Sequence, residues 1–217
     1  MHTVHLCKKI CYTKIRYLLK LCQKGITMFL FLFITFLALL SYYIKKNNKA
    51  EEKVLHDFLE KETMANHSRK QDISKLDYII IPWDKLPANL ETPSKKAFWK
   101  LKDKKVLNLT GISNTELKLQ YGVSNLDTLS EYDGNFMDMV QLLPIYAKEL
   151  IEQGYVSYAK ELLEFGISCH ADSRQIYFLL ADIYKQENQT NKIAMLIEKA
   201  QTLPELTKQA VLKQLSI

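Results

Sequence analysis

The chain has 217 residues and a formal net charge of +6, from 30 lysines and arginines against 24 aspartates and glutamates. The first 50 residues hold nine of the basic residues and none of the acidic ones, so the other 167 carry 21 basic against 24 acidic residues, a net charge of −3. This distribution argues against a nucleic-acid-binding domain, and a total of only six glycines argues against a phosphate-cradling loop.

Residues 1–25 form a basic leader rich in Cys, His, Lys and Tyr. The codons of Lys24-Gly25 can spell a purine-rich ribosome-binding core just before Met28, so translation can also start at Met28 and leave the leader untranslated.

Residues 26–44 are predicted to form a transmembrane helix. The run ITMFLFLFITFLALLSYYI holds no charge, and at ~1.5 Å per residue it spans about 28 Å, enough to cross a bilayer core. A cleaved secretory signal is the main alternative, but LALLSYYI offers no small-x-small cleavage site. We therefore expect an uncleaved anchor in contact with membrane lipid, and a single-pass protein of the cell membrane.

The orientation of this anchor depends on the start of translation. From Met28, the nearest basic residues are Lys45, Lys46 and Lys49 behind the span, which predicts a cytoplasmic C-terminal part. With the leader translated, six basic residues precede the span and four follow it closely, which weakly favours the opposite side. Both orientations stay open at this point.

Residues 45–71 predict a charged juxtamembrane helix and linker, with Val54, Leu55, Phe58 and Leu59 on one face.

Residues 72–134 are expected to form a compact mixed segment. Leu76–Pro87 is predicted to be one strand or a stretch lying in a groove. Thr92-Pro93-Ser94 predicts the start of a short amphipathic helix, with Phe98, Trp99 and Leu101 buried and its lysines solvated. The alternative for Lys95–Lys105 is docking on anionic lipid headgroups.

Further along this segment, Ser113-x-x-Glu116 is a capping box that predicts a short helix closed by Gly122. Four leucines are expected to pack on the helices that follow and to supply a third packing unit: Leu107, Leu109, Leu117 and Leu119.

The stretches 140–173 and 174–207 align with each other at a spacing of 34 residues. Small residues coincide at Ala147/Ala181 and Gly166/Ala200, where two helices must approach closely. Gly154 meets Asn188, and both residue types enter a left-handed turn at low cost. Matching positions are Ala147, Gly154, Ala159, Leu163 and Gly166 in copy one, and Tyr177, Leu180, Ala181, Tyr184, Ile197 and Ala200 in copy two.

These positions and the period resemble the tetratricopeptide repeat (TPR) family. The resemblance implies an all-α or mostly α fold, in which a membrane-spanning helix and a short mixed segment precede a two-repeat, TPR-like α-hairpin array over residues 135–217. Ile193 departs from the usual small residue, and Pro144 predicts a kink if the first helix begins at Asn135.

Pro204–Leu215 predicts a closing helix, with Leu206, Ala210 and Leu212 or Lys213 at helical spacing. Because stacked hairpins usually need about three units, we expect the upstream segment to dock on the array or the protein to oligomerise. The arrangement also resembles small single-span proteins of Gram-positive anaerobes that share an LTG-SNT-like segment. This resemblance points to no particular activity.

Catalytic and metal-binding patterns are weak throughout the chain. Cys7, Cys11 and Cys22 lie near His2 and His5 but lack a second ligand pair at zinc spacing. Cys169-His170 is predicted to lie in a solvated loop between helices. Three aspartates have no partner at a meaningful spacing and are expected on solvated faces: Asp72, Asp77 and Asp84. We therefore expect no enzyme activity, cofactor, metal, small-molecule substrate or nucleic-acid partner.

The sequence favours a membrane-anchored protein–protein interaction scaffold that binds a partner segment in the groove formed by the first helices of the two repeats. The groove residues predicted from the register are Gln141, Lys148, Gln175, Phe178, Asp182 and Lys185. The alternative is a structural accessory subunit of an envelope enzyme or of a secretion or assembly complex, with no free ligand. Affinity for a free peptide would favour the scaffold, and instability without a co-expressed neighbour would favour the subunit.

Overall fold

The computed structural model describes residues 2–87 and 90–215, with the side chains of residues 28–49, 51–87 and 90–215. These residues form eight α-helices and two short 3₁₀ helices, with no strand among them, so the predicted all-α class is confirmed. The chain divides into two compact units, Met1–Thr63 and Met64–Ile217, and each is described by itself.

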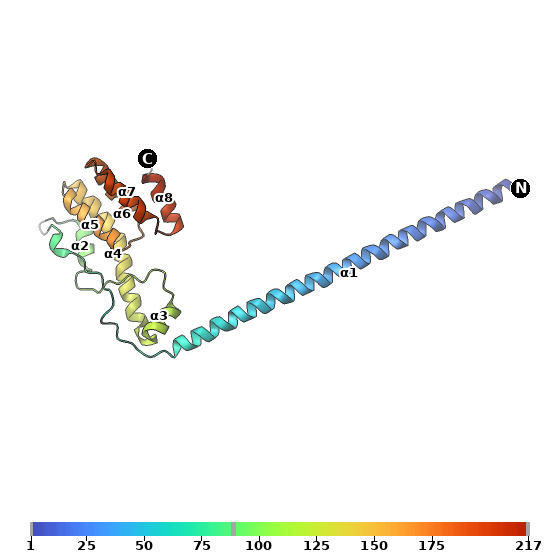
Figure 1. Cartoon of the computed structure of the whole chain (residues 1–217), viewed down its shortest axis with the longest axis horizontal. Coiled ribbons are helices and arrows are strands. Elements are labelled where there is room, and N and C mark those ends of the chain that lie inside the picture. Colours follow the sequence, from blue (N-terminus) through green and yellow to red (C-terminus); the bar gives the residue numbers. More distant parts are fainter. Residues whose placement is uncertain (1, 88–89, 216–217) are drawn as a thin grey trace. The chain divides into compact units, whose positions relative to one another are not determined.

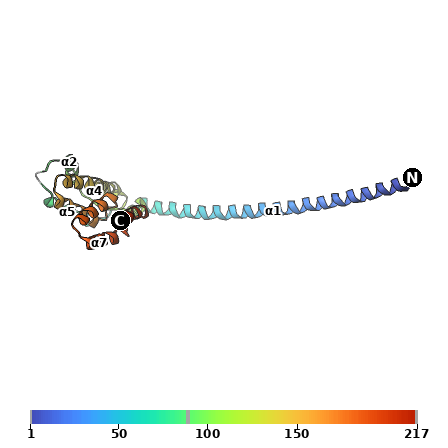
Figure 2. The same cartoon turned by 90° about the horizontal axis from the view of Figure 1, so that it is seen from above.

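Helix α1 (His2–Asn66) runs without interruption, and its residues up to Thr63 belong to the first unit (Figures 1 and 2). Its Met28–Asn66 part is the one described segment long and apolar enough to cross a membrane, with a mean hydropathy of 1.9 over its most apolar window. None of the residues of that window is buried. Val54, Leu55, Phe58 and Leu59 are also exposed on this helix.

The stretch from Leu76 to Pro87 is not a strand. Its only regular element is the 3₁₀ helix η1 (Trp83–Lys85), and Ile79 N–H donates to the Val106 carbonyl at 2.9 Å. Pro82 and Pro87 have no N–H to continue a strand ladder. The strand alternative is therefore wrong, while Ile81 and Leu86 are buried in the main core.

Helix α2 (Pro93–Trp99) begins where the sequence predicts. The Thr92 hydroxyl accepts the Lys95 N–H at 3.2 Å, and Pro93 occupies the first turn, where its missing N–H costs nothing. Phe98 and Leu101 are buried, and α2 packs on α4. The prediction that the lysines of this helix are solvated is wrong for Lys95, which is buried and pairs with Glu91 at 3.4 Å. This arrangement supports the ordinary amphipathic interpretation over lipid docking, because the apolar side chains are covered by protein.

Helix α3 (Asn114–Tyr121) carries both bonds of the predicted capping box between Ser113 and Glu116. It ends at Gly122, whose φ of 88° lies in the left-handed region. A Cβ at this position would lie 2.3 Å from the Arg69 carbonyl oxygen. Only glycine fits this turn, because the coil after α1 passes directly against it.

The 3₁₀ helix η2 (Val123–Asn125) leads into α4 (Leu126–Glu152). Helix α4 therefore begins at Leu126 rather than at Asn135. Pro144 lies inside it, deep enough that about five turns precede the proline. The predicted start was too late because Asp133-Gly134, a pair that commonly marks a turn, lies inside the helix.

Two helix pairs follow each other in the second unit, α4 with α5 (Val156–Ser168) and α6 (Arg174–Gln186) with α7 (Thr190–Ala200). Consecutive helices pack on each other, α4 also contacts α6, and α8 (Glu205–Leu215) packs on both α6 and α7 (Figure 1).

The turns of the two pairs repeat at the 34-residue period. Gly154 and Asn188 both have positive φ, 82° and 57°. Tyr155 N–H donates to the Leu150 carbonyl at 2.8 Å, and Gln189 N–H donates to the Tyr184 carbonyl at 2.8 Å. The predicted equivalence of Gly154 and Asn188 is thus seen in the backbone.

The main core confirms the need for small residues at the helix contacts. Ala147, Ala181 and Ala200 are buried. A Cβ on Gly166 would lie 3.1 Å from Leu143 Cδ1 and 3.2 Å from Ile176 Cδ1, so even an alanine at this position would require these side chains to shift by a few tenths of an ångström.

The four predicted leucines do not pack as expected. Leu107, Leu109 and Leu117 form a separate small core with Leu129 on the first part of α4, while Leu119 is 40% exposed. The mixed segment instead reaches the main core through other residues: Ile81, Leu86, Phe98, Leu101 and Val106. The cause is that α4 begins at Leu126 rather than at Asn135. Its additional first turns carry Leu129, which packs against Leu107, Leu109 and Leu117.

The closing helix α8 is present, but its buried face differs from the predicted one. Val211 and Leu215 are buried, whereas Leu206 is 85% exposed. Leu203, in the turn before the helix, is buried in place of Leu206. The buried face of α8 is therefore shifted along the sequence by about one residue from the predicted face, for example from Ala210 to Val211.

Candidate partner-binding surfaces

The predicted groove residues lie on α4 and α6, the first helices of the two pairs. Gln141 and Lys148 are exposed on α4. Gln175, Asp182 and Lys185 are exposed on α6, while Phe178 is half-buried against the main core. Because α4 and α6 are in contact, these six residues lie on neighbouring helices. We call this surface the α4–α6 face.

One residue of this face was missed from the sequence. Ile145 is 50% exposed on α4, four residues after Gln141 and three before Lys148, so it shares their side of the helix. Its helical spacing from Gln141 and Lys148 is the sequence signal that could have identified it. With Ile145 and Phe178, the α4–α6 face offers apolar contact area as well as charged groups.

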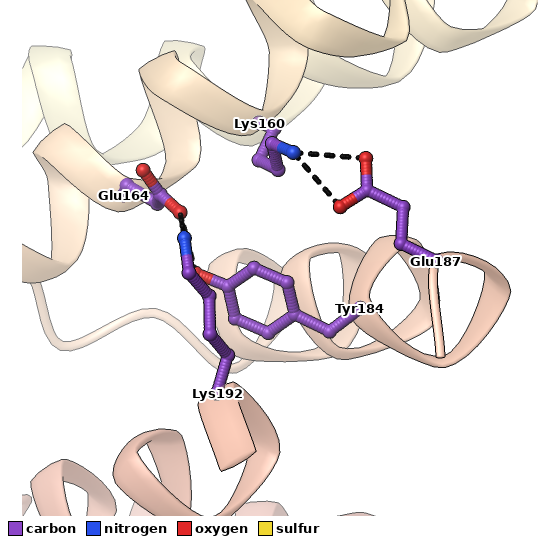
Figure 3. A network of polar contacts seen from close by, with 5 residues as sticks. All are labelled: Lys160, Glu164, Tyr184, Glu187 and Lys192. Carbon is purple, nitrogen blue, oxygen red and sulfur yellow. Dashed lines mark hydrogen bonds and ion pairs between the residues drawn. The ribbon is translucent and has the colours of Figure 1, made fainter. Parts of the chain in front are cut away.

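A network of polar contacts joins the helix pairs on another side of α6 (Figure 3). Glu164 of α5 accepts hydrogen bonds from the Tyr184 hydroxyl at 2.7 Å and from Lys192 Nζ at 2.8 Å. Lys160 Nζ donates to both carboxylate oxygens of Glu187, each at 2.8 Å.

The electrostatics of this network suit a structural clamp. Burial raises the pKa of Glu164, but the hydrogen bonds from Lys192 and Tyr184 outweigh it, so the net pKa lies below the usual value of 4.5. Burial and the bond to Glu164 raise the pKa of Tyr184. At neutral pH the acid is therefore ionised and the phenol protonated, and each already has a partner.

A second surface was not predicted from the sequence. It is a hollow of about 830 Å³ between the stretch around Ile79, the loop before α3, the α5–α6 turn and the turn before α8. We call it the Asp77 hollow. Its lining residues are Asp77, Tyr78, Ile79, Ile80, Leu107, Asn108, Thr110, Phe165, Ser168, Cys169, His170, Asp172, Tyr177, Thr202, Leu203 and Pro204.

The Asp77 hollow contains the Cys169-His170 pair, which lies in the predicted loop. His170 has a φ of 58° and is exposed, and the Asn108 amide donates to the Cys169 carbonyl at 3.1 Å. Burial raises the pKa of the Cys169 thiol, with a smaller contribution from Asp77. Burial, with help from Asp172, raises the pKa of Tyr177 to about 12. The thiol is thus protonated at neutral pH, unlike an activated nucleophile.

Comparison with family models, curated proteins and solved structures finds no match for this chain. Its function is therefore inferred from its own residues and contacts.

Metal ligands are sparse in the described side chains. The one group of three close ligands is His56, Asp57 and Glu60, exposed on α1, and exposed groups of this kind are common without an ion. Asp72 accepts hydrogen bonds from the Ser74 N–H and hydroxyl, which lower its pKa. The leader cysteines and histidines (Cys7, Cys11, Cys22, His2 and His5) lie outside the described side chains.

Proposed function

We propose that the protein is a membrane-anchored interaction scaffold whose TPR-like helix pairs bind a segment of a partner protein. The observation that carries the proposal is the repeated geometry of the two pairs, with equivalent turn hydrogen bonds 34 residues apart and first helices in contact. Stacked helix pairs of this kind present extended binding surfaces. The apolar part of α1 would attach this surface to a membrane.

The α4–α6 face is the surface we assign to the partner. Its charged residues have opposite signs, because Lys148 and Lys185 are positive and Asp182 is negative, and Ile145 and Phe178 add apolar area. An amphipathic helix or an extended segment could contact both kinds of group. Among the described residues, Lys148 pairs with Glu152 in an exposed ion pair of 3.8 Å, which costs little to rearrange.

A binding role fits the titratable groups of the second unit better than a catalytic one. The groups with shifted pKa values are committed to structural partners, as Glu164 is to Lys192, or are held in their neutral forms, as Tyr177 and Cys169 are. Catalytic groups instead need a free reactive atom whose pKa matches the working pH.

In-cell photo-crosslinking tests the proposal. A photoreactive amino acid is placed in the full chain at Gln141, Lys148, Gln175 or Lys185, one position at a time, in the cells that produce the protein. Ser157 on α5 and Ala194 on α7 are matched control positions, because both are exposed on second helices.

We expect a discrete adduct with one partner protein from the α4–α6 positions, and none from Ser157 or Ala194. The double substitution Asp182→Lys and Lys185→Glu should weaken the adduct formed from Lys148 while the amount of protein stays constant. Equal adducts from both sets of positions, or none from the four α4–α6 positions, would show that this face does not bind a partner.

A further inference from the structure

We propose that the Asp77 hollow binds a cationic, extended segment of a partner protein. This site goes beyond the function proposed above, because none of the lining residues of the hollow belongs to the α4–α6 face. It is a second recognition surface in the same folded unit.

The size and walls of the hollow suit a peptide. Its volume of about 830 Å³ lies within the range of roughly 300–1,000 Å³ that is usual for ligand sites. Ile79, Phe165, Tyr177 and Leu203 line it with aliphatic and aromatic carbon. These walls can cover apolar side chains of a bound segment.

The charge of the hollow selects the sign of the ligand. Asp77 and Asp172 contribute two carboxylates, and no lysine or arginine is among the lining residues. Within the part of the chain that the structure describes, neither carboxylate has a hydrogen-bond or ion-pair partner. Two uncompensated carboxylates beside apolar walls attract lysine or arginine and repel acidic segments.

The backbone at Ile80 favours a peptide over a small cation. The Ile80 side chain is 84% exposed, and its N–H and C=O have no hydrogen-bond partner among the described residues. The neighbouring Ile79 N–H is fixed to the Val106 carbonyl at 2.9 Å, which holds this stretch at the rim. One free donor and one free acceptor are the groups that an extended chain pairs with.

A segment with alternating cationic and apolar residues would contact the apolar walls, the two carboxylates and the backbone groups of Ile80. Because successive side chains of an extended chain point to opposite sides, its apolar residues can face the walls. Its lysines or arginines can then reach the rim carboxylates with their long side chains.

The test uses Cys169 as a reporter in the full chain, held in detergent micelles. The chain has four cysteines, so the substitutions Cys7→Ser, Cys11→Ser and Cys22→Ser leave one thiol, in the wall of the hollow. The rate of its alkylation by N-ethylmaleimide is measured in the presence of the peptide acetyl-Lys-Val-Arg-Val-Lys-amide. It is measured again with an acidic peptide in which Glu replaces each Lys and Arg, and with spermidine.

We expect the cationic peptide to slow alkylation about tenfold at ten times its Kd, and the acidic peptide to have no effect. Asp77→Asn and Asp172→Asn should each raise the Kd about threefold, and about tenfold together, and added salt should weaken binding further. Asp138→Asn is the matched control, because Asp138 is an exposed aspartate of α4 outside the hollow. Ile80→Pro should weaken binding more than Ile80→Ala, because it also removes the free N–H.

The absence of protection by the cationic peptide would overturn the proposal, as would equal protection by the acidic peptide or unchanged binding in the double Asp→Asn variant. Equal protection by spermidine and by the peptide would show that the hollow binds small cations without recognising a peptide, and this result would also overturn the proposal. Photo-crosslinking from Lys148 in the Asp77→Asn and Asp172→Asn variant reports on the α4–α6 face separately, so failure at one site is distinguished from failure at the other.

Discussion

Tyr184 of α6 donates its hydroxyl proton to Glu164 of α5 at 2.7 Å, and so joins the second helix pair to the first. The same carboxylate oxygen accepts from Lys192 of α7 at 2.8 Å, and the Lys192 ammonium lies 5.2 Å from the centre of the Tyr184 ring. One ionised carboxylate on α5 thus contacts side chains of α6 and α7, and its charge contributes to the stacking of the two pairs.

Acid should therefore destabilise the folded unit partly through Glu164. Its pKa in the folded protein lies below the usual value of 4.5, so its contribution to the free energy of unfolding is complete above pH 4.5 and is lost as the pH falls through the lower folded pKa. Glu164→Gln, which mimics the protonated acid, should lower the free energy of unfolding by about 1 kcal/mol or less at neutral pH. Urea unfolding at a series of pH values measures the difference.

Glu161→Gln is the matched control for this prediction, because Glu161 is about one turn away on α5 and pairs with Lys85 only across 3.8 Å between exposed side chains. It should change the free energy of unfolding by less than about 0.5 kcal/mol. The free energy of unfolding of Glu164→Gln should approach that of the unsubstituted protein as the pH falls, because Glu164 itself then becomes protonated. A difference between the two proteins that stays constant down to pH 3 would contradict the assigned role.

Ala147→Trp and Ala181→Trp should each destabilise the folded unit by ~1–3 kcal/mol or more, because both alanines are buried at helix contacts and a large side chain overpacks them. Thermal unfolding followed by circular dichroism measures the effect. Ala194→Trp is the control, since Ala194 is exposed on α7 and has room for a large side chain. Similar melting of all three variants would refute the repeat register.

The elements predicted correctly from sequence are those set by local chemistry. The capping box at Ser113, the cap at Thr92 and the turns at Gly154 and Asn188 each depend on residues a few positions apart. A single sequence displays these relationships directly. The repeat period also predicted where the small residues Ala147 and Gly166 lie, because each has a small residue at the matching position of the second copy.

The features that were missed depend on contacts between residues far apart in the chain. The buried Asn125 amide donates to the Gln71 carbonyl at 2.8 Å and to the Tyr121 carbonyl at 2.7 Å, and so ties the coil after α1 to the start of α4. Nothing in the residues around Asn125 indicates a partner more than 50 positions away. The Asp77 hollow was missed for the same reason, since its two carboxylates come together only in the folded chain.

The anchor prediction is tested by fractionation. The full chain should sediment with membranes and resist carbonate extraction, because the apolar window of α1 is long enough to span a bilayer. A fragment that begins at Lys45 should be soluble. Recovery of a shortened protein from the culture medium, cut near residue 42, would instead show that the apolar run is a cleaved signal.

The last prediction concerns the boundary of the folded unit. A fragment of residues 64–217 should unfold cooperatively, because it keeps both cores, including Phe98 and Leu101 against α4. A fragment of residues 135–217 should be molten or aggregate, because it cuts α4 and uncovers Tyr146, which packs on Phe98 with ring centres 5.8 Å apart. Loss of such buried aromatic contacts costs about 3–5 kcal/mol, a large share of the stability of a small domain.

Hydrogen exchange in the longer fragment locates this boundary by residue. Slow exchange is expected between Val106 and Gly122, where Leu107 N–H donates to the Tyr132 carbonyl at 3.2 Å and Gly122 N–H to the Lys118 carbonyl at 2.8 Å. The first of these bonds joins the mixed segment to α4, so it opens only when the two separate. Fast exchange across the whole stretch, with α4 to α7 still protected, would mean that the segment is a linker and that the helix pairs fold without it.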